Sequence, residues 1–464
     1  MVFSSALFLF AFLPITYILY ISVRSLKIKN FILMVASLVF YSFGRLDWLA
    51  LLILSVLCNY GAGLMMQKGD RIRRISLCIS VFLNLGILFA FKYLNFFTGL
   101  LSHIPFMGIE QTEITLPIGI SFFTFQGMSY VIDVYRNPSM ASKSFGKVLL
   151  YIAFFPQLVA GPIVKYGDIS HQIDSRNGSG EDTVKGIERF VTGLVKKLFF
   201  ANVLGFVADG VYGLEASLLD MRLAWLGALC YTLQIYYDFS AYSDMAIGLG
   251  GIFGFKINEN FAHPYVSSSI KEFWRRWHIS LSAWFREYLY IPLGGNRKGV
   301  WRARLNRLMV FFFTGMWHGA NWTFILWGLW HGLFLFLEDA FKKKIPAFAG
   351  HIYTMLAVVL GFVLFRADSV GQAFSFAEAM FTGFDFSRVN TALLCKFLTP
   401  STVFTLLAGI IFVMPVKDFV IKKLQIRGMR IPAFLKLSAV MLVFILCVIK
   451  LAASSFNPFI YTQF

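Results

Sequence analysis

Two histidines lie in strongly apolar stretches of the chain, where an ionisable side chain is energetically costly. His318 stands in LMVFFFTGMWHGANW, and His331 follows thirteen residues later in the next apolar stretch. Ionisable groups inside membrane segments are costly and usually serve a function. Imidazole exchanges protons near neutral pH, so each is a candidate general base, although an interhelical hydrogen bond is the structural alternative. His331 is the weaker candidate, because that separation need not place both rings on one helical face.

The residues around His318 favour close approach of another group to its ring. Gly315 and Gly319 flank the histidine and leave room for a second backbone or a substrate. Trp317 and Asn321 are expected to contact substrate, with the Asn321 amide orienting a ring or a bound carbonyl. The histidine lies about a dozen residues into its apolar run, which places it roughly at mid-bilayer at about 1.5 Å per residue.

The segment IKEFWRRWHISLSAWFREYLYIPLGG at 270–295 combines cations with bulky aromatic side chains. Spacings of three and four residues share a helical face, so one helix with a polar, cationic stripe is expected. The stripe comprises Lys271, Arg275, His278, Ser282 and Arg286. One interpretation is an interfacial helix whose arginines meet lipid headgroups. The other is a cationic mouth in which Arg275, Ser282 and Arg286 bind an anionic, phosphate-bearing acyl donor and His278 takes part in the chemistry.

A further polar cluster, Gln234, Asp238 and Asp244, lies in the apolar stretch YTLQIYYDFSAYSDMAIGLGG. Intramembrane carboxylates usually face a cavity or a cation. The two aspartates are therefore expected either to pair with arginines of the 270–295 segment or to line a channel. A secondary transporter would use Asp238, Asp244 and His318 as a proton relay, but such transporters usually carry internal repeats, and the sequence shows none.

The absence of several common motifs narrows the reaction that these histidines can serve. The chain has no G-x-S-x-G elbow, no H-E-x-x-H pair and no Walker loop. A histidine without a nucleophilic side chain suits a general base that activates an incoming hydroxyl against a thioester. Acyl transfer fits, because the thioester is already reactive and correct positioning supplies much of the remaining rate.

The composition indicates a polytopic membrane protein embedded in a lipid bilayer. Of 464 residues, 58% are hydrophobic and only 14% are charged, whereas a soluble domain has about 25% charged residues. The net charge is +18, and clusters of cations lie between apolar runs at 24–29, 67–74 and 417–430. That placement is typical of cytoplasmic loops, so no soluble basic patch remains for nucleic acid. The five cysteines are scattered without a C-x-x-C pair, so no metal site is expected.

Apolar runs of about 18 residues or more can cross a bilayer, and they recur along the chain. The expected spans are 1–23, 30–45, 47–66, 75–94, 186–212, 219–253, 308–340 (two passages), 350–366, 400–416 and 432–453. Pro156, Gly161 and Pro162 interrupt 148–166, which is expected to be re-entrant or kinked beside a cavity. The polar stretch 167–186 is expected to be flexible and exposed. Residues 1–464 are predicted to form one domain, an all-α integral membrane protein with about 10–13 transmembrane or re-entrant helices.

Four motifs in this order resemble the membrane-bound O-acyltransferase family. They are FFPQLVAGPI, YYDFSAYSDMAIGLGGIFGF, FWRRWHISLSAWFREYLYIPLGGNR and GMWHGANWTFILWGLWHG. The likeness runs through nearly the whole chain and is greatest to the bacterial alginate O-acetyltransferase branch. It implies helices around a central funnel or tunnel that joins the cytoplasmic side to a thinned extracytoplasmic layer. It also implies that His318, in the WHG motif, is catalytic and that His278 is the second characteristic histidine, nearer the cytoplasmic mouth.

The resemblance further implies an enzyme of the bacterial cytoplasmic membrane with no bound cofactor. Acetyl groups would come from cytoplasmic acetyl-CoA, or another acyl thioester, and cross the bilayer. An extracytoplasmic partner of the SGNH-hydrolase class would then acetylate a polysaccharide, which this chain serves only indirectly. The alternative within the family is D-alanyl transfer to teichoic acid, with a carrier protein docked at the cytoplasmic face.

Overall fold

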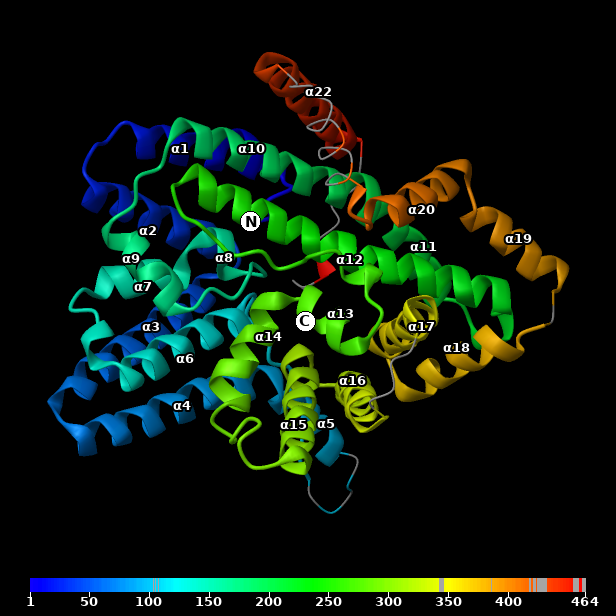
Figure 1. Ribbon diagram of the computed structural model, residues 1–464, viewed down its shortest axis with the longest axis horizontal. Coiled ribbons are helices and arrows are strands. Elements are labelled where there is room, and N and C mark those ends of the chain that lie inside the picture. Colours follow the sequence, from blue (N-terminus) through cyan, green and yellow to red (C-terminus); the bar gives the residue numbers. More distant parts are fainter. Residues whose placement is uncertain are drawn as a thin grey trace. The chain divides into compact units, whose positions relative to one another are not determined.

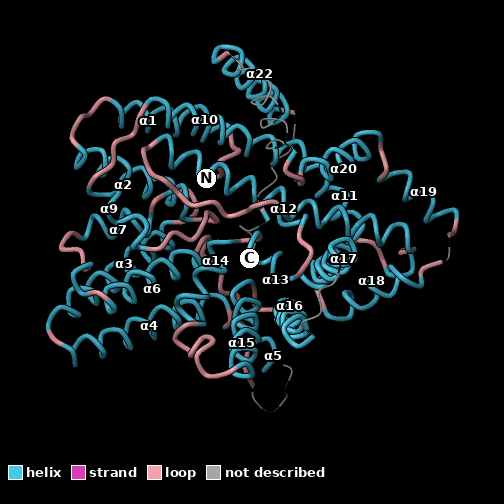
Figure 2. Tube along the Cα trace, in the orientation of Figure 1, coloured by secondary structure: helices cyan, strands magenta, loops and turns pink. Residues whose placement is uncertain are grey.

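The computed structural model describes most of the chain, and the part that it describes consists of helices and loops without a strand (Figure 2). The residues outside this description are His103, Pro105, Met107, 342–345, Asp385, 417–418, 420–422, 424–431, 454–458 and 461–464. Most of the predicted basic loop at 417–430 and most of the C-terminal SSFNPFIYTQF therefore lie outside the described residues. The all-α class predicted from the sequence is confirmed.

The chain divides into two compact units, which are described separately. The first comprises 1–190, 242–258 and 461–464, and the second comprises 191–241 and 259–460. The long helix α12 (Met221–Ile252) contributes residues to both. The organisation of 1–464 as a single domain stays a prediction.

The first unit contains the helices of the N-terminal part of the chain and the end of α12 (Figure 1). In chain order these helices are a π-helix Phe8–Phe12, α1 (Leu13–Ile21), α2 (Leu26–Ser42), α3 (Leu46–Met65), α4 (Asp70–Lys92), α5 (Leu94–Ser102), α6 (Ile120–Arg136), α7 (Phe145–Ala153), α8 (Phe155–Leu158), α9 (Tyr166–Asp174) and α10 (Gly180–Val195).

A buried polar cluster joins helices α3 and α4 in this unit. Asn84 Nδ2 donates to Asn59 Oδ1 at 2.8 Å, and Ser80 Oγ donates to the same oxygen at 3.2 Å. Gly127 of α6 packs against these amides, because a Cβ there would meet Asn59 and Asn84. In a membrane, lipid is as apolar as leucine, so helices are held together by hydrogen bonds between polar side chains and by close packing at small residues. The cluster therefore explains asparagines in otherwise apolar helices without a functional role.

The interrupted segment 148–166 is broken as predicted. Helix α7 ends at Ala153, the short helix α8 ends at Leu158, and every side chain from 148 to 164 is buried. The backbone groups freed by the break find partners: Phe155 N–H donates to Ser37 Oγ at 3.1 Å, and Gln157 Nε2 donates to Tyr151 O at 2.7 Å. Irregular backbone at membrane depth is tolerated where it is buried in protein, and this one is.

The stretch 167–186 is largely exposed, as predicted, but most of it is helical where a flexible loop was expected. Helix α9 extends to Asp174, and α10 begins at Gly180, so only a short loop lies between them. Ile169 and Ile173, spaced one helical turn apart, are buried, and Arg176 in the loop is only 9% exposed. The polar composition concealed this amphipathic turn, because its two isoleucines are surrounded by solvent-facing polar residues.

The second unit carries the motifs with the histidines. Its helices are α11 (Asn202–Tyr212), most of α12, α13 (Ile270–Arg276), α14 (Ile279–Phe285), α15 (Val300–His318), α16 (Trp322–Phe341), α17 (Ala347–Arg366), α18 (Val370–Thr382), α19 (Arg388–Phe397), α20 (Pro400–Phe412) and α22 (Ala433–Ala452).

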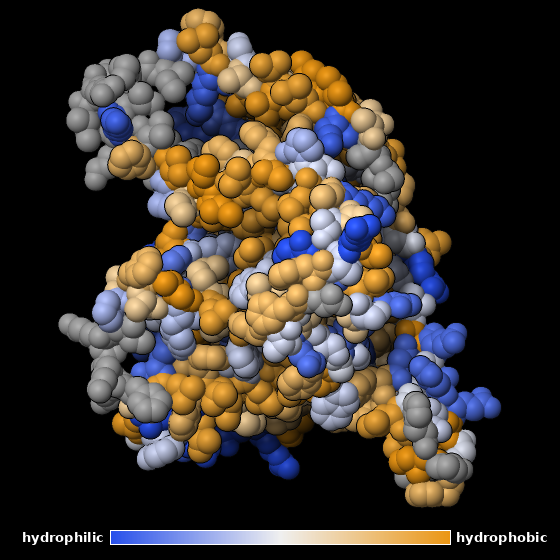
Figure 3. Space-filling view, turned by 90° about the vertical axis from the view of Figure 1, so that its right-hand side faces the viewer, coloured by the Kyte–Doolittle hydropathy of each residue, from blue (hydrophilic) through white to orange (hydrophobic). Residues whose placement is uncertain are grey.

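Several helices of the described residues are suited to crossing a membrane. By length and apolarity five qualify, and a sixth does if α19 and α20, bent by 66°, form one span: Leu46–Lys68, Asp70–Lys92, Gly180–Tyr212, Ala347–Arg366, Phe434–Ala452 and Arg388–Phe397 with Pro400–Phe412. Phe82 on α4, Phe206 on α11 and Phe404 on α20 are 70 to 76% exposed. Broad apolar areas, orange in Figure 3, lie on the face shown there. Such surfaces suit lipid, whereas the predicted total of about 10–13 transmembrane or re-entrant helices stays a prediction.

Candidate active site

His318 is the last residue of α15, at the turn into α16. The two helices pack backbone against backbone: a Cβ on Gly315 would collide with the Phe324 carbonyl oxygen, and one on Gly328 would collide with the Phe311 carbonyl oxygen. The stretch 308–340 therefore belongs to two tightly packed helices, whereas its two membrane passages stay a prediction. The space that Gly315 leaves is taken by the neighbouring backbone rather than left open.

Aromatic rings surround the His318 imidazole. The side chain is 3% exposed, and its ring stands nearly perpendicular to those of Trp317, Trp327 and Phe365, with centroids 4.9, 4.9 and 5.2 Å away. Gly319 allows this packing, because a Cβ there would strike the Phe324 ring. Edge-to-face contacts of this kind fix ring orientation and exclude water. The histidine therefore lies in a shaped, dry environment.

The segment 270–295 does not form the single helix that its spacing predicted. Helix α13 ends at Arg276, Trp277 is extended, and His278 adopts a left-handed backbone with φ of 44° before α14 begins. The break turns His278 inward, so that it is fully buried, while Arg275 and Arg286 are exposed. His278 therefore does not belong to the cationic stripe. A helical-face argument fails here because it assumes an unbroken helix.

Asn260 holds the break in place, and sequence reasoning missed it. Its Oδ1 accepts from Ser280 N–H at 3.0 Å, from Ser280 Oγ at 2.9 Å and contacts His278 Nδ1 at 3.3 Å. Its backbone oxygen accepts from Ile279 N–H at 3.0 Å. Asn260 is fully buried and lies 18 residues before His278 in the chain. No helical or strand period links residues so far apart, so only a motif comparison over the NENFAHPY loop had a chance of finding it.

These contacts assign the proton on the neutral His278 ring. A backbone N–H can only donate, so the Asn260 atom that faces Ser280 N–H must be the amide oxygen. An amide oxygen only accepts, so His278 Nδ1 must carry the hydrogen in the neutral ring. The lone pair then lies on Nε2. Asn260 thus determines which nitrogen of His278 is available as a proton acceptor.

One indole, that of Trp317, contacts both characteristic histidines. The Trp317 ring centroid is 6.0 Å from that of His278 and 4.9 Å from that of His318. Phe239 of α12 packs edge-on against the His278 ring at 4.6 Å. Two histidines forty positions apart in the sequence therefore belong to one aromatic cluster within the second unit. The expectation that Trp317 lies at the site agrees with this geometry, and its contact with substrate stays a prediction.

His331 on α16 is also buried in this cluster but is held differently. Its ring centroid is 5.2 Å from those of Trp274 and Trp327, and 6.2 Å from the parallel ring of Phe273. Within the described residues, neither of its ring nitrogens has a hydrogen-bond partner. It shares Trp327 with His318, so it lies nearer the site than its place in the sequence indicated. Nothing orients its nitrogens toward a reaction.

The remaining residues expected to bind substrate are distributed unevenly. Arg275 and Arg286 are exposed, and Ser282 Oγ donates to the Trp274 carbonyl oxygen at 3.3 Å. Asn321 uses both ends of its amide on backbone: Nδ2 donates to Asp368 O at 2.9 Å, and Oδ1 accepts from Thr323 N–H at 3.2 Å. These bonds order the turn that starts α16. A substrate role for these residues stays a prediction.

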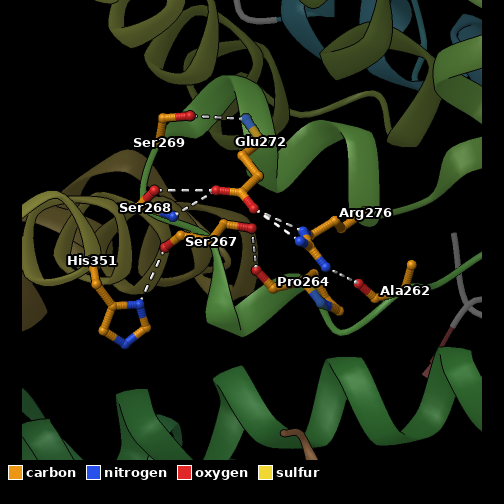
Figure 4. A network of polar contacts seen from close by, with 8 residues as sticks. All are labelled: Ala262, Pro264, Ser267, Ser268, Ser269, Glu272, Arg276 and His351. Carbon is orange, nitrogen blue, oxygen red and sulfur yellow. Dashed lines mark hydrogen bonds and ion pairs between the residues drawn. The ribbon is translucent and has the colours of Figure 1, made fainter. Parts of the chain in front are cut away.

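Arg276 is committed to structure rather than to substrate. Its Nε donates to Glu272 at 3.0 Å and its Nη1 to the Ala262 carbonyl oxygen at 3.0 Å, while Glu272 also accepts from Ser268 N–H (Figure 4). Ser269 Oγ caps α13 by accepting from Glu272 N–H. The Ser268 N–H, together with Arg276, holds the pKa of the Glu272 carboxyl below its usual value. This network anchors the loop before α13 and so supports the turn at His278.

The carboxylates of α12 are paired with lysine and arginine from other segments than expected. Asp238 forms an ion pair of 2.6 Å with Lys197, both 2% exposed, and its second oxygen accepts from Ile460 N–H at 2.7 Å. Asp244 pairs with Arg189 at 2.7 Å. The prediction that the two aspartates pair with arginines of 270–295 is therefore wrong for the ion pairs of Asp238 and Asp244 described above. The cations come from the helical stretch 186–212, whose own charges the apolar pattern had hidden.

Comparisons with known proteins place both histidines in a matched region. The sequence profile described as the membrane-bound O-acyltransferase family matches residues 33–376. The probable alginate O-acetylase of Pseudomonas putida is 40% identical, with 100% of each chain covered. The peptidoglycan O-acetyltransferase of Helicobacter pylori is 35% identical over 82% of this chain and 80% of that protein. The teichoic acid D-alanyltransferase of Streptococcus thermophilus is 28% identical over 49% and 58%, respectively.

The family match covers most of the chain and includes the turn at His278, the α15–α16 hairpin and the helices that bury them. The sequence motifs, the helical fold with its exposed phenylalanines and the two histidines that contact Trp317 agree with that match. This chain is a multi-pass membrane O-acyltransferase and belongs to the membrane-bound O-acyltransferase family.

Proposed function

We propose that this enzyme moves acetyl groups from a cytoplasmic thioester, acetyl-CoA, across the membrane for O-acetylation of an extracytoplasmic polysaccharide. The observation that carries the proposal is the pair of buried histidines, His278 and His318, whose rings both pack against the Trp317 ring. Two of the relatives are named for O-acetylation, one of alginate and one of peptidoglycan. Both acceptors are cell-surface glycans, which supports a glycan as the final acceptor here.

In the proposed step His318 acts as the general base. It takes the proton from an incoming hydroxyl while that oxygen attacks the thioester carbonyl carbon; the new C–O bond forms, the C–S bond breaks, and the proton passes to the departing thiolate. The surrounding rings exclude water, which protects the thioester from hydrolysis and strengthens polar interactions inside the site. His278, with its lone pair on Nε2, provides a second proton acceptor beside the same indole.

The acceptor side of the proposal needs a second protein. An extracytoplasmic partner of the SGNH-hydrolase class would receive the acetyl group and transfer it to the polysaccharide, with this enzyme in the bacterial cytoplasmic membrane. The alternative is D-alanyl transfer to teichoic acid from a carrier protein, which the relative from Streptococcus thermophilus favours. Acetyl transfer is preferred because the acetylating relatives are more similar to this chain and cover more of it.

The identity of the acyl donor distinguishes acetyl transfer from D-alanyl transfer. Proteoliposomes containing the purified full-length protein would be supplied with radiolabelled acetyl-CoA or with a D-alanyl carrier-protein thioester, and label transfer to a purified SGNH-class protein or to isolated surface glycan would be measured. We expect acetyl label to pass and D-alanyl label to remain on its donor, with His318→Gln as the background. Transfer of D-alanine alone would replace the proposal with its alternative, and transfer of neither would reject both.

A further inference from the structure

The first unit contains a polar cavity that acyl transfer at the histidines does not use. It has a volume of about 600 Å³ and lies between the loop that joins α1 to α2, the loop that joins α9 to α10 and the end of α12. Its charged side chains are Arg24, Lys29, Arg176 and Asp174. The cavity is thus lined by three cations and one carboxylate.

Arg176 is a buried cation whose bonds all go to neutral groups. Its Nε donates to Tyr20 Oη at 3.3 Å and to Phe253 O at 3.1 Å, and its Nη1 donates to Asn30 Oδ1 at 2.6 Å. The guanidinium lies over the Phe255 ring at 4.1 Å. Among the described residues, Nη2 has no hydrogen-bond partner, although the side chain is only 9% exposed. A buried charge of this kind is costly unless something neutralises it.

The rest of the cavity does not supply that neutralising charge. Asp174 is already engaged by Lys147 at 2.5 Å. Arg24 and Lys29 form no ion pair with a described carboxylate; Lys29 Nζ lies 4.8 Å from the Tyr20 ring centroid. Burial lowers the pKa of the Arg176 guanidinium, as expected for a cation without a nearby anion. The cavity therefore carries an excess of positive charge.

We propose that this cavity is a binding site for a phosphate group. A guanidinium with a spare N–H suits a tetrahedral oxyanion, and two further cations on flexible stems can complete the neutralisation of a doubly charged group. The loop that carries Arg24 and Lys29 has the basic character of a cytoplasmic loop. The phosphate therefore belongs either to an anionic phospholipid headgroup or to a soluble nucleotide. This site is independent of the proposed acetyl transfer.

Binding of two probes to the purified full-length protein in detergent tests the site and identifies the source. Phosphatidylglycerol, with phosphatidylcholine as its zwitterionic reference, represents the lipid, and adenosine 5′-monophosphate represents the nucleotide. We expect one probe to saturate. The double variant Arg24→Gln with Lys29→Gln and the variant Arg176→Gln should each weaken it about tenfold or more, because each removes charge-assisted hydrogen bonds.

The matched control for the double variant is Arg71→Gln with Arg74→Gln, which removes the same two charges from exposed positions outside the cavity and should leave the affinity within about twofold. Arg176 also ties together backbone segments of the first unit, so its variant reports on folding as well as on binding. The double variant keeps those bonds and is decisive. The proposal fails if neither probe saturates the wild-type protein, or if the double variant binds as tightly as Arg71→Gln with Arg74→Gln.

Discussion

His278 and His331 are both completely buried and both lie against tryptophans, yet the protein treats them differently. His278 lies at a break between two helices, in a left-handed backbone, with Nδ1 against the Asn260 amide. His331 lies within α16 and packs against aromatic rings and Gly361 of α17, and within the described residues its nitrogens have no hydrogen-bond partner. The first arrangement orients a particular nitrogen, whereas the second only fills space.

His318 resembles His278 in position and His331 in surroundings. Like His278 it lies where a helix is interrupted, at the C-terminal end of α15; like His331 it packs against Trp327. Burial and aromatic contact therefore do not distinguish a reactive histidine from a packing one. The feature that His278 and His318 share, and that His331 lacks, is a place at the end of a helix, where the backbone is interrupted.

The largest effect is expected at His318. Replacing it by glutamine keeps most of the volume and some polarity but removes the proton acceptor, so acyl transfer should fall about 10²- to 10⁴-fold. Transfer to the acceptor protein would be measured alongside membrane expression and thermal unfolding, both of which should stay near wild type. Activity above about a tenth of wild type in a folded variant would remove His318 as the base and leave His278 as the remaining candidate.

A smaller but more diagnostic effect is expected at Asn260. Asn260→Ala leaves Ser280 N–H and His278 Nδ1 without their acceptor, so activity should fall about 10- to 100-fold, as for other residues that orient a functional histidine. Asn260→Asp keeps the accepting oxygen and should recover much of that loss. Its negative charge also favours the protonated imidazole, so the acid limb of the pH–rate profile should move to higher pH.

Comparing Asn260→Ala with Asn260→Asp distinguishes a role in orienting His278 from a purely structural role of Asn260. If both variants lose activity equally with an unchanged pH profile, Asn260 stabilises the turn and nothing more. Thermal unfolding of each variant, followed in the same detergent, shows whether the turn itself has been lost.

The smallest effect is expected at His331. His331→Phe fills nearly the same space between Trp274 and Trp327 and removes two buried nitrogens that lack hydrogen bonds among the described residues. Activity should stay within about twofold, and thermal stability should stay level or rise, because an unsatisfied buried polar group costs about 1–3 kcal/mol. A loss of activity comparable to that of His318→Gln would place His331 in the proton pathway and erase the contrast with His278.

The secondary structure could be predicted correctly from the sequence in some regions and not in others. At 308–340 the long apolar run and its glycines correctly predict two closely packed helices, since the helix period and small residues act locally. At 270–295 the same periodic reasoning predicts one helix and is wrong, because a loop residue remote in sequence supplies the bonds that break it. At 167–186 polar composition hides a helix whose two buried isoleucines provide its docking face.

Charged side chains show the same limit. The apolar stretches around Asp238 and Asp244 indicate that each carboxylate faces a cavity or a cation, but the sequence could not name Lys197 and Arg189 as the partners. For Arg176 the sequence indicates nothing unusual. Only the structure shows that this buried cation is hydrogen-bonded to neutral groups and not to a carboxylate of the described residues.

By itself the sequence determined the all-α membrane class, the O-acyltransferase family and the two histidines that mark it, because composition, period and motif are properties of consecutive residues. The tertiary structure alone decided that His278 leaves the cationic stripe, that Asn260 faces its Nδ1 and that the Trp317 ring contacts both His278 and His318. These features depend on hydrogen bonds and ring contacts between segments far apart in the chain. Their geometry exists only once the helices have packed.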